Sequence, residues 1–586
     1  MKDGIEICDG AGKRIGRRAV LGGIAGGVAA AILAACGSDA TTATNTVKPA
    51  TVAGTTGGTT AASSSVVSPT SGGTAAMTPV APAMAMPATA APAAPMAASA
   101  AKKGGTLKAG LDGDVLTFDP LTSGAYADRE LYYNLYDTLV AFDPNLQIIP
   151  ALALKWETPD PKTYVFSLRK DVKFHDGTDF DAAAVKFNIE RYLNDKTSRR
   201  KAEIDTITSV DVVDPSTVKF NLKAPFAPLL ANLADRAGMM LSPKAVQTLG
   251  NDALILKPIG AGSGPFRFVE ALKDDHITFD RNPNYWKKDA SGNALPYLDR
   301  LTYRPITDAT VLLGNLQTGD VDITYSIAAK DVAGVKSGNM LTLKDAPGLG
   351  FYAISFQTVK EPFNKKEFRQ AVAEALNRDE INKVVYFGVN PTAYGPIPPS
   401  SWAYDANYKP YTGNVAKAKE YLKAGGKPDG FAFDLKISSG SPTTVQLAQL
   451  IKDQMAKAGI TVNIVQQERT KTSTDQDNGD FQALLFGWSG RADPDGNTYN
   501  IFHTGGGLNY GKYSSPPVDD ALDKARAATD QGARKEAYQQ AQKLLVDDAA
   551  MVFYNFAPAY LIAQPKVQGV QLYPDFMMRF EAASLK

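Results

Sequence analysis

Apolar and polar positions follow two different periods along the chain after residue 103. Residues 163–168 alternate apolar and polar side chains, which is the pattern of a strand with one buried face. Residues 182–193 place apolar side chains at helical spacing, directly after Asp181, a residue type that often caps a helix. Segments of both kinds recur to the C-terminus, and this mixture predicts an α/β fold.

The segment between residues 431 and 464 predicts a strand, a helix and a second strand. Apolar residues alternate from 433 to 437, recur at helical spacing from 445 to 455, and alternate again from 462 to 464. Gly459 separates the helical pattern from the second strand. A βαβ unit of this kind packs as a right-handed crossover, so we expect two parallel strands here.

Further elements are expected on either side of this unit. Asn364 and Glu367 have the spacing of a capping box and would open a helix. Helical spacing predicts three more helices, over 128–139, 518–528 and 532–546, and an apolar run predicts a strand over 551–555.

The apolar run 481–486 predicts a buried strand that ends in the segment GWSGRADPDG, residues 487–496. Glycines, a proline and three charged residues rule out continued regular structure in that segment. A large aromatic side chain, a guanidinium and two carboxylates at the end of a buried strand suit a binding site, because such loops carry function on a rigid support. The alternative is an ordinary solvated turn, with Trp488 folded back into the core.

The first 36 residues have the pattern of an export signal. Four basic residues between 13 and 18 precede an uncharged run of small and apolar residues over 19–35. This run is shorter than a typical membrane-spanning helix and is diluted by glycines, so a permanent span is the weaker interpretation. Residues 16–21 resemble a twin-arginine motif but lack part of it, so the general and the twin-arginine export routes both stay open.

Cys36 follows Leu33, Ala34 and Ala35, a sequence that resembles the lipobox of bacterial lipoproteins. That resemblance implies that Cys36 is lipidated and becomes the mature N-terminus. The alternative role of Cys36 is a small residue in an apolar helix. Residues 37–103 are rich in Ala, Thr and Pro and lack large apolar side chains at a regular period, so we expect a disordered tether. Coil-like scaling gives it a mean reach of about 45 Å.

Composition excludes several classes of function. The formal charge of +1, from 62 basic and 61 acidic residues, gives no electrostatic case for binding nucleic acid. The only cysteines are Cys8 and Cys36, and the three histidines are widely separated. We therefore expect no metal site and no cofactor. His175 is expected to have a structural role, and His503 lacks a second ligand at metal-binding spacing.

Four strings, in this order, resemble the family 5 extracellular solute-binding proteins, which are the dipeptide-, oligopeptide- and nickel-binding components of ABC importers. They are YVFSLRKDVKFHDGT at 164–178, GSGPFRF at 262–268, RNPNYW at 281–286 and FRQAVAEALNR at 368–378. Several motifs in the right order are more specific than any single one. The resemblance extends from about Gly104 to the C-terminus.

The resemblance implies a periplasmic-binding-protein-like fold of the class II type, with two lobes, an extra subdomain on the first lobe and a ligand cleft between the lobes. Hinges are expected near residues 324–326 and 550–555. The expected boundaries are 104–136, 225–324 and 551–586 for lobe I, 137–224 for the extra subdomain, and 325–550 for lobe II.

The implied function is that of a lipid-anchored binding protein on the extracytoplasmic face of a bacterial membrane. It would be a monomer and not an enzyme, and it would capture a small ligand, peptide or peptide-like, by hinge closure and deliver it to an ABC permease. The alternatives are a non-peptide anionic or sugar-like ligand or a metal chelate, a sensory binding protein, and, least favoured, a hydrolase.

Trp488 and Ser489 match ligand-lining positions of the family. In its peptide-binding members an aspartate after the Gly-Trp motif pairs with the peptide's α-ammonium group, but here Arg491 holds that place and the loop is one residue shorter. A guanidinium there would favour a carboxylate, a phosphate or a sugar hydroxyl, unless Asp493 takes over the amine. Tyr126 and Tyr554 complete the set of expected ligand-binding residues.

Overall fold

The computed structural model describes residues 102–586. The expected export signal, the lipidation residue Cys36 and nearly all of the expected tether lie outside these residues. Within the described part of the chain, no helix has both the length and the apolar character that a membrane span requires.

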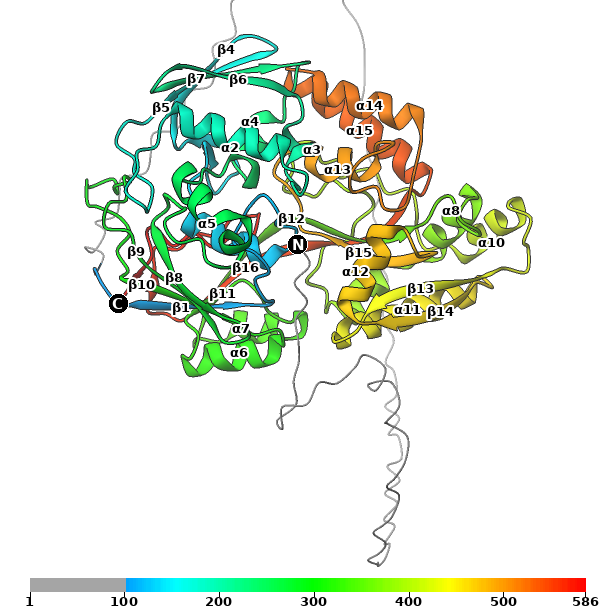
Figure 1. Cartoon of the computed structure of the whole chain (residues 1–586). Helices are drawn as coiled ribbons and strands as arrows, with labels where there is room; N and C mark the ends of the chain where they lie inside the picture. Colours follow the sequence, from blue (N-terminus) through cyan, green and yellow to red (C-terminus); the bar gives the residue numbers. More distant parts are fainter. Residues whose placement is uncertain (1–101) are drawn as a thin grey trace, which may run out of the picture. The chain divides into compact units, whose positions relative to one another are not determined.

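A mixed sheet of ten strands runs through the described part of the chain (Figure 1). Strands on one side of it, around β1, and on the other, around β13, pair in parallel, while the two long central strands β12 and β16 are antiparallel. The strands in spatial order are β14 (Thr461–Gln467), β13 (Ala432–Ser438), β15 (Ala483–Trp488), β12 (Thr342–Phe356), β16 (Met551–Ala563), β11 (Ile323–Thr324), β1 (Thr106–Leu111), β10 (Arg300–Pro305), β9 (His276–Arg281) and β8 (Phe266–Leu272).

β12 and β16 belong to both halves of this sheet. Their register shifts between Pro347 and Phe351 of β12, opposite Pro558 and Phe556 of β16. Before the shift, β12 pairs with the part of β16 that continues to β11, and after it β12 also pairs with β15. The two strands therefore connect two lobes. We call the half that contains β1 the first lobe and the half that contains β13 the second lobe.

The first lobe carries an additional antiparallel sheet with the strand order β4, β5, β7, β6. This sheet lies inside the segment expected to form the extra subdomain. The strands are β4 (Ala153–Asp160), β5 (Thr163–Leu168), β7 (Thr217–Leu222) and β6 (Ile207–Asp214). The longer helices of this lobe are α1 (Tyr126–Leu135), α2 (Ala182–Asn194), α5 (Pro243–Leu256) and α6 (Ala309–Thr318).

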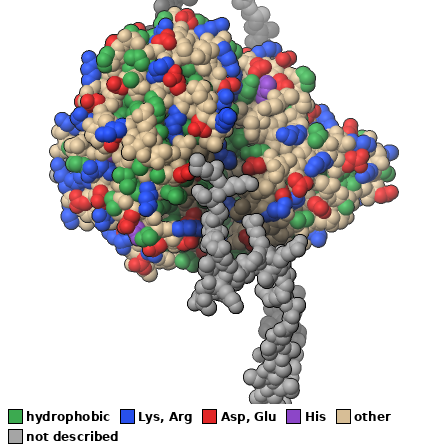
Figure 2. Space-filling view, in the orientation of Figure 1, with side chains coloured by type: hydrophobic (Ala, Val, Ile, Leu, Met, Phe, Trp, Pro, Cys, Tyr) green, Lys and Arg blue, Asp and Glu red, His purple; other side chains and the backbone are tan. Residues whose placement is uncertain are grey.

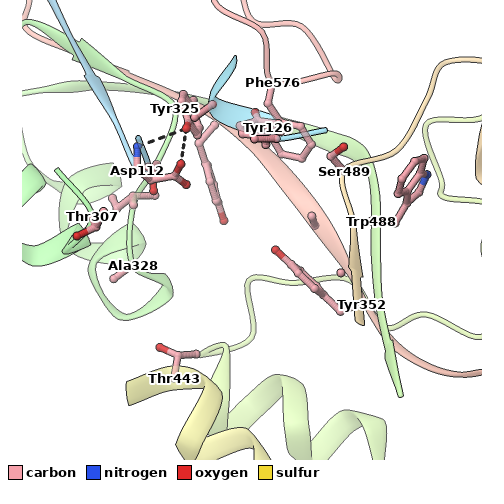
Figure 3. A pocket seen from close by; sticks show the side chains of 18 of the residues that line it. Asp112, Tyr126, Thr307, Tyr325, Ala328, Tyr352, Thr443, Trp488, Ser489 and Phe576 are labelled. Carbon is pink, nitrogen blue, oxygen red and sulfur yellow. Dashed lines mark hydrogen bonds between the residues drawn. The ribbon is translucent and has the colours of Figure 1, made fainter. Parts of the chain in front are cut away.

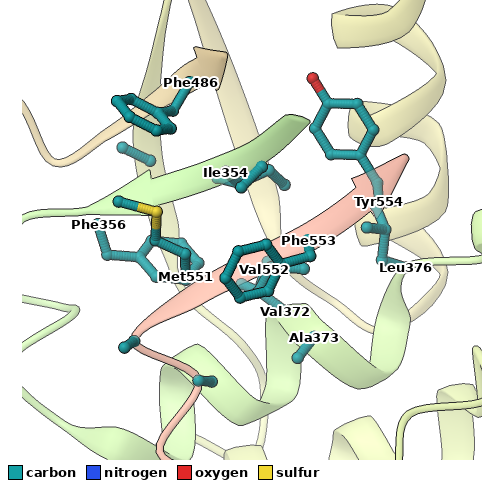
Figure 4. Close-up of a cluster of buried hydrophobic side chains, with 14 of the residues drawn as sticks. Ile354, Phe356, Val372, Ala373, Leu376, Phe486, Met551, Val552, Phe553 and Tyr554 are labelled. Carbon is teal, nitrogen blue, oxygen red and sulfur yellow. The ribbon is translucent and has the colours of Figure 1, made fainter. Parts of the chain in front are cut away.

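The second lobe packs helices around the other half of the large sheet. They are α8 (Lys366–Ala375), α9 (Arg378–Val385), α10 (Val415–Ala424), α11 (Pro442–Lys457), α12 (Arg469–Asn478), α13 (Asp495–Phe502), α14 (Pro516–Ala527) and α15 (Gln531–Asp547). Its core forms where Ile354 of β12 and Phe553 of β16 meet Val372 of α8, all fully or nearly fully buried (Figure 4). Burying such a side chain contributes about 1.5–3 kcal/mol, so this core holds both crossing strands in place.

Several elements confirm the sequence predictions. Asp181 caps α2, since its side chain accepts a hydrogen bond of 2.8 Å from the Ala184 amide. β5 has the predicted bounds, and β13, α11 and β14 form the predicted βαβ unit with parallel strands. The helices predicted near residues 518 and 532 are α14 and α15, and the strand predicted at 551 is the start of β16.

The predicted capping box is wrong. Helix α8 is present, but its cap position is Lys365, which makes no capping hydrogen bond through its side chain. The amides of Asn364 and Lys365 instead bond back to the carbonyl oxygens of Lys360 and Pro362, at 2.9 and 3.4 Å. The chain is therefore still in a turn at Asn364, and the helix begins two residues later.

The strand predicted at 481–486 is shifted along the chain. β15 runs from Ala483 to Trp488, because Gly487 and Trp488 still pair with Tyr352 and Phe351 of β12. Regular structure also resumes early, at Asp495, where α13 begins. The irregular segment is thus limited to residues 489–494.

The expected lobe boundaries and the hinges near 324–326 and 550–555 stay predictions. The first half of β12, which was expected to belong to lobe II, pairs with the first-lobe part of β16.

On the face of the molecule shown in Figure 2, acidic and basic side chains are interspersed, in line with the formal net charge of +1.

Candidate ligand-binding cleft

A cavity of about 940 Å³ lies where the two lobes meet. Its walls come from the end of β1 and the start of α1 in the first lobe, from the starts of α11 and α12 and the end of β15 in the second, and from the crossing strands (Figure 3). The lining residues used below are Asp112, Asp114, Tyr126, Tyr325, Tyr352, Thr443, Arg469, Thr470, Ser473, Trp488, Ser489 and Phe576.

Three of the six predicted ligand-binding residues line this cavity: Tyr126, Trp488 and Ser489. Tyr126 begins helix α1, and its ring meets the rings of Tyr325 and Phe576 edge to face, with centroids 5.2 and 6.0 Å apart. The first-lobe wall is therefore a packed aromatic surface, which suits the apolar part of a small ligand.

The loop after Trp488 is held against β12 by backbone geometry and by one side chain. Gly490 has φ +82°, and a Cβ atom there would lie 2.2 Å from the backbone of Leu349, so only glycine fits. Asn497, fully buried in α13, accepts hydrogen bonds from the Trp488 indole at 2.9 Å and from the Arg491 amide at 2.8 Å. Asn497 thus fixes the orientation of Trp488 at the cavity, a role that the sequence did not reveal.

Arg491 lies behind this loop and is not among the residues that line the cavity. Its guanidinium lies over the Trp488 ring, 4.6 Å from the centroid, and its Nη1 donates to the Gly490 carbonyl oxygen at 2.7 Å. Its Nε lies 3.5 Å from Oδ2 of Asp235, a buried residue of the first lobe. Burial, and next the charge of Arg129, lower the pKa of Arg491, while Asp235 opposes this shift. Arg491 therefore connects the Trp488 loop to the other lobe.

Asp493 and Tyr554 do not line the cavity either. Both carboxylate oxygens of Asp493 accept hydrogen bonds from Arg534 of α15, at 2.8 and 2.9 Å. Tyr554 is almost fully buried, and its ring stacks on Tyr352 with centroids 6.2 Å apart. Tyr352 itself lines the cavity, so Tyr554 supports a wall of it from behind.

Three charged residues that the sequence did not single out line the cavity: Asp112, Asp114 and Arg469. Asp112 and Asp114 come directly after β1, and Arg469 is the first residue of α12 in the other lobe. No motif marks any of them. The only sequence signal for Asp112 is its position directly after a strand, where loops often carry function.

The histidines do not contribute to this cavity. His175 is buried in the first lobe, with Nε2 3.0 Å from the Gly264 carbonyl oxygen, and burial lowers its pKa to about 4. This placement fits the expected structural role. Within residues 102–586, no three His, Cys, Asp or Glu side chains are grouped so that they could hold a metal ion.

The two lobes, the crossing strands and the cavity between them define a two-lobed solute-binding protein. The family model described as bacterial extracellular solute-binding proteins, family 5 Middle, matches residues 147–509, and the chain belongs to this family of ABC importer components. The two-lobed α/β fold is the one that the resemblance implied.

Known proteins agree with this assignment. The chain is 31% identical over 503 residues to the dipeptide-binding protein of Escherichia coli, covering 80% of this chain and 92% of that protein. It is 31% identical over 481 residues, with the same coverage, to the glutathione-binding protein GsiB of Pectobacterium atrosepticum. The structure of the periplasmic binding protein DppA from Helicobacter pylori in complex with the peptide STSA matches with a TM-score of 0.75 and 29% identity, covering 83% of this chain and 98% of that one.

Glu130 of α1, one turn after Tyr126, is fully buried. Its Oε2 accepts a hydrogen bond of 3.0 Å from the Met578 amide, but burial dominates and raises its pKa to about 8. Because the folded-state pKa lies above that of the unfolded chain, the unfolded state loses this proton first as the pH rises. Glu130 therefore costs stability progressively from about pH 4.5 to about pH 8.

We predict that Glu130→Gln reduces the loss of stability between pH 5 and pH 8. Glutamine keeps an acceptor for the Met578 amide but has no proton to lose, so the linked term of about 1 kcal/mol per pH unit disappears. Chemical unfolding of the wild type and the variant at several pH values measures the effect. Glu190→Gln, at a partly exposed residue of α2, is the control and should follow the wild type. Parallel curves for Glu130→Gln and the wild type would contradict the assignment of a raised pKa.

Proposed function

We propose that the protein captures a peptide or peptide-like ligand between its lobes and delivers it to an ABC permease. The cavity of about 940 Å³, walled by both lobes, carries this proposal. Its volume falls within the range usual for small-ligand sites, and contacts from both lobes favour the closed arrangement over an open one. The names of the dipeptide- and glutathione-binding relatives support a peptide-like ligand.

Of the predicted residues, we propose that Tyr126, Trp488 and Ser489 contact the ligand. Arg491 would act indirectly, because it holds the Trp488 loop and meets Asp235 of the first lobe. Asp493 and Tyr554 would position α15 and Tyr352 respectively. The register shift in β12 between Pro347 and Phe351 is a second candidate position for the hinge, next to the positions expected from the resemblance.

Native mass spectrometry of the purified protein, followed by calorimetry with a panel of di- and tripeptides, tests the ligand class. We expect a small molecule that is released on denaturation, and peptides that bind with micromolar or lower Kd. The peptides should be recovered unchanged after incubation, because a binding protein does not turn its ligand over. If sugars or organic anions bind and no peptide does, the proposed ligand class is wrong.

We predict that Trp488→Leu weakens peptide binding by about tenfold or more. The substitution removes the indole that lines the cavity and its hydrogen bond to Asn497, a loss on the scale of one to two kcal/mol. Calorimetry with the tightest peptide of the panel measures the change. Trp156→Leu, in the four-stranded sheet of the first lobe, is the matched control and should bind like the wild type. Equal affinities for all three proteins would remove Trp488 from the site.

We also propose that the protein is anchored to the extracytoplasmic face of the membrane by a lipid on Cys36, acts as a monomer, and reaches its permease through the segment 37–103. Support for this anchor comes from the lipobox-like sequence and from the uncharged run before it.

We predict that Cys36→Ser moves the protein from the membrane fraction to the soluble extracytoplasmic fraction of the producing bacterium. Without the thiol there is no site for the acyl chains, each buried CH₂ of which contributes about 0.8 kcal/mol to membrane binding. Cys8→Ser is the matched control and should stay with the membranes. Membrane retention of Cys36→Ser would show that another part of the chain anchors the protein.

A further inference from the structure

The cavity carries charges of opposite sign on its two walls. Asp112 and Asp114 belong to the first lobe and Arg469 to the second, and all three line the cavity. Asp112 is the more exposed of the two acidic residues. Burial raises the pKa of Asp112, and the charge of Arg469 opposes this rise from the other wall. No salt bridge within 4 Å joins these two residues, so the cavity separates a carboxylate from a guanidinium.

Asp112 lies beside Tyr325 of the aromatic wall, and no basic side chain of the described residues pairs with it. Its Oδ1 accepts a hydrogen bond from the Tyr325 hydroxyl, as Figure 3 shows. Within residues 102–586, no Lys or Arg nitrogen lies within salt-bridge distance of its carboxylate. Burial, the largest influence, raises the pKa of Asp112. A positive group of a ligand would therefore gain a charge-assisted partner that the protein itself does not supply.

Arg469 is the corresponding unpaired group on the opposite wall. No carboxylate of the described residues lies within salt-bridge distance of its guanidinium. Thr470 and Ser473 from the same helix and Thr443 from α11 line the cavity beside it and add hydroxyl donors. A guanidinium among hydroxyl groups is suited to a carboxylate, which it binds through two parallel hydrogen bonds.

We propose that the cavity selects a zwitterionic ligand, with its ammonium group at Asp112 and its carboxylate at Arg469. This inference rests on the proposed function and gives each lobe one end of the ligand. Such a ligand would bridge the lobes, so both charged contacts would form together only in the closed arrangement. In this assignment the partner of the ligand's amine, Asp112, lies on the first lobe. The loop after Trp488 does not supply it, because Arg491 faces Asp235 and Asp493 is paired with Arg534.

The test uses the full-length protein and three forms of one dipeptide, Ala-Phe: free, N-acetylated and C-amidated. We expect the wild type to bind the free form about tenfold or more tightly than either blocked form, since each block removes one charge-assisted contact. Asp112→Asn should weaken binding of the free dipeptide by a similar factor and leave binding of the N-acetyl form unchanged. Arg469→Gln should likewise weaken binding of the free dipeptide, and it should leave binding of the C-amidated form unchanged.

Exposed residues outside the cavity provide matched controls. Asp171→Asn makes the same change as Asp112→Asn, and Lys457→Gln removes one positive charge as Arg469→Gln does; both should bind all three forms like the wild type. Thermal unfolding shows whether each variant is folded, and Asp112→Glu should recover part of the lost affinity.

Two results would overturn the proposal, and they differ in what they imply. If the wild type binds the dipeptide and both cavity variants bind it equally well, Asp112 and Arg469 are not the charge subsites, while the proposed function stands. If the wild type binds no form of this dipeptide and no peptide of the wider panel, the ligand class and this inference both fail.

Discussion

Asp235 is a buried carboxylate that receives positive charge from both lobes. Arg129 of α1 binds it with two nitrogens at 2.9 and 2.8 Å, and Arg491 approaches from the second lobe at 3.5 Å. Burial alone would raise the pKa of Asp235, but the charges of Arg129, Arg491 and Arg236 hold it well below its usual value. Removing one partner would leave a buried charge that water cannot solvate. The contact between Arg491 and Asp235 therefore couples the relative position of the lobes to the Trp488 loop.

The ligand site depends on this constraint because its walls come from both lobes. The Trp488 loop is fixed to β12 by Gly490 and Asn497, and Arg491 carries it against the first lobe. The aromatic wall around Tyr126 comes from the first lobe alone. A ligand between these walls contacts both lobes, so it binds the closed arrangement more tightly than the open one. This difference in affinity shifts the protein toward the closed arrangement, which a permease can distinguish.

The sequence predicted several local elements well, although the capping box at Asn364 was wrong and the strand before Trp488 was shifted by two residues. The cap at Asp181 and the βαβ unit depend on short-range hydrogen bonds and on periodicity, and the position of the Trp488 loop follows from one buried strand. The opposition of Asp112 and Arg469 could not be predicted, because it arises only when segments far apart in the chain fold against each other. The role of Arg491 could not be predicted for the same reason, because nothing in the sequence relates Arg491 to Asp235.

The central claim is that the two lobes close on a ligand in the cavity between them. Small-angle X-ray scattering of the full-length protein, with and without a saturating peptide identified by calorimetry, measures this most directly. The account predicts that the peptide reduces the radius of gyration, and that Asp235→Asn needs more peptide to reach the same compact state. An unchanged scattering profile at full occupancy of the site would contradict it.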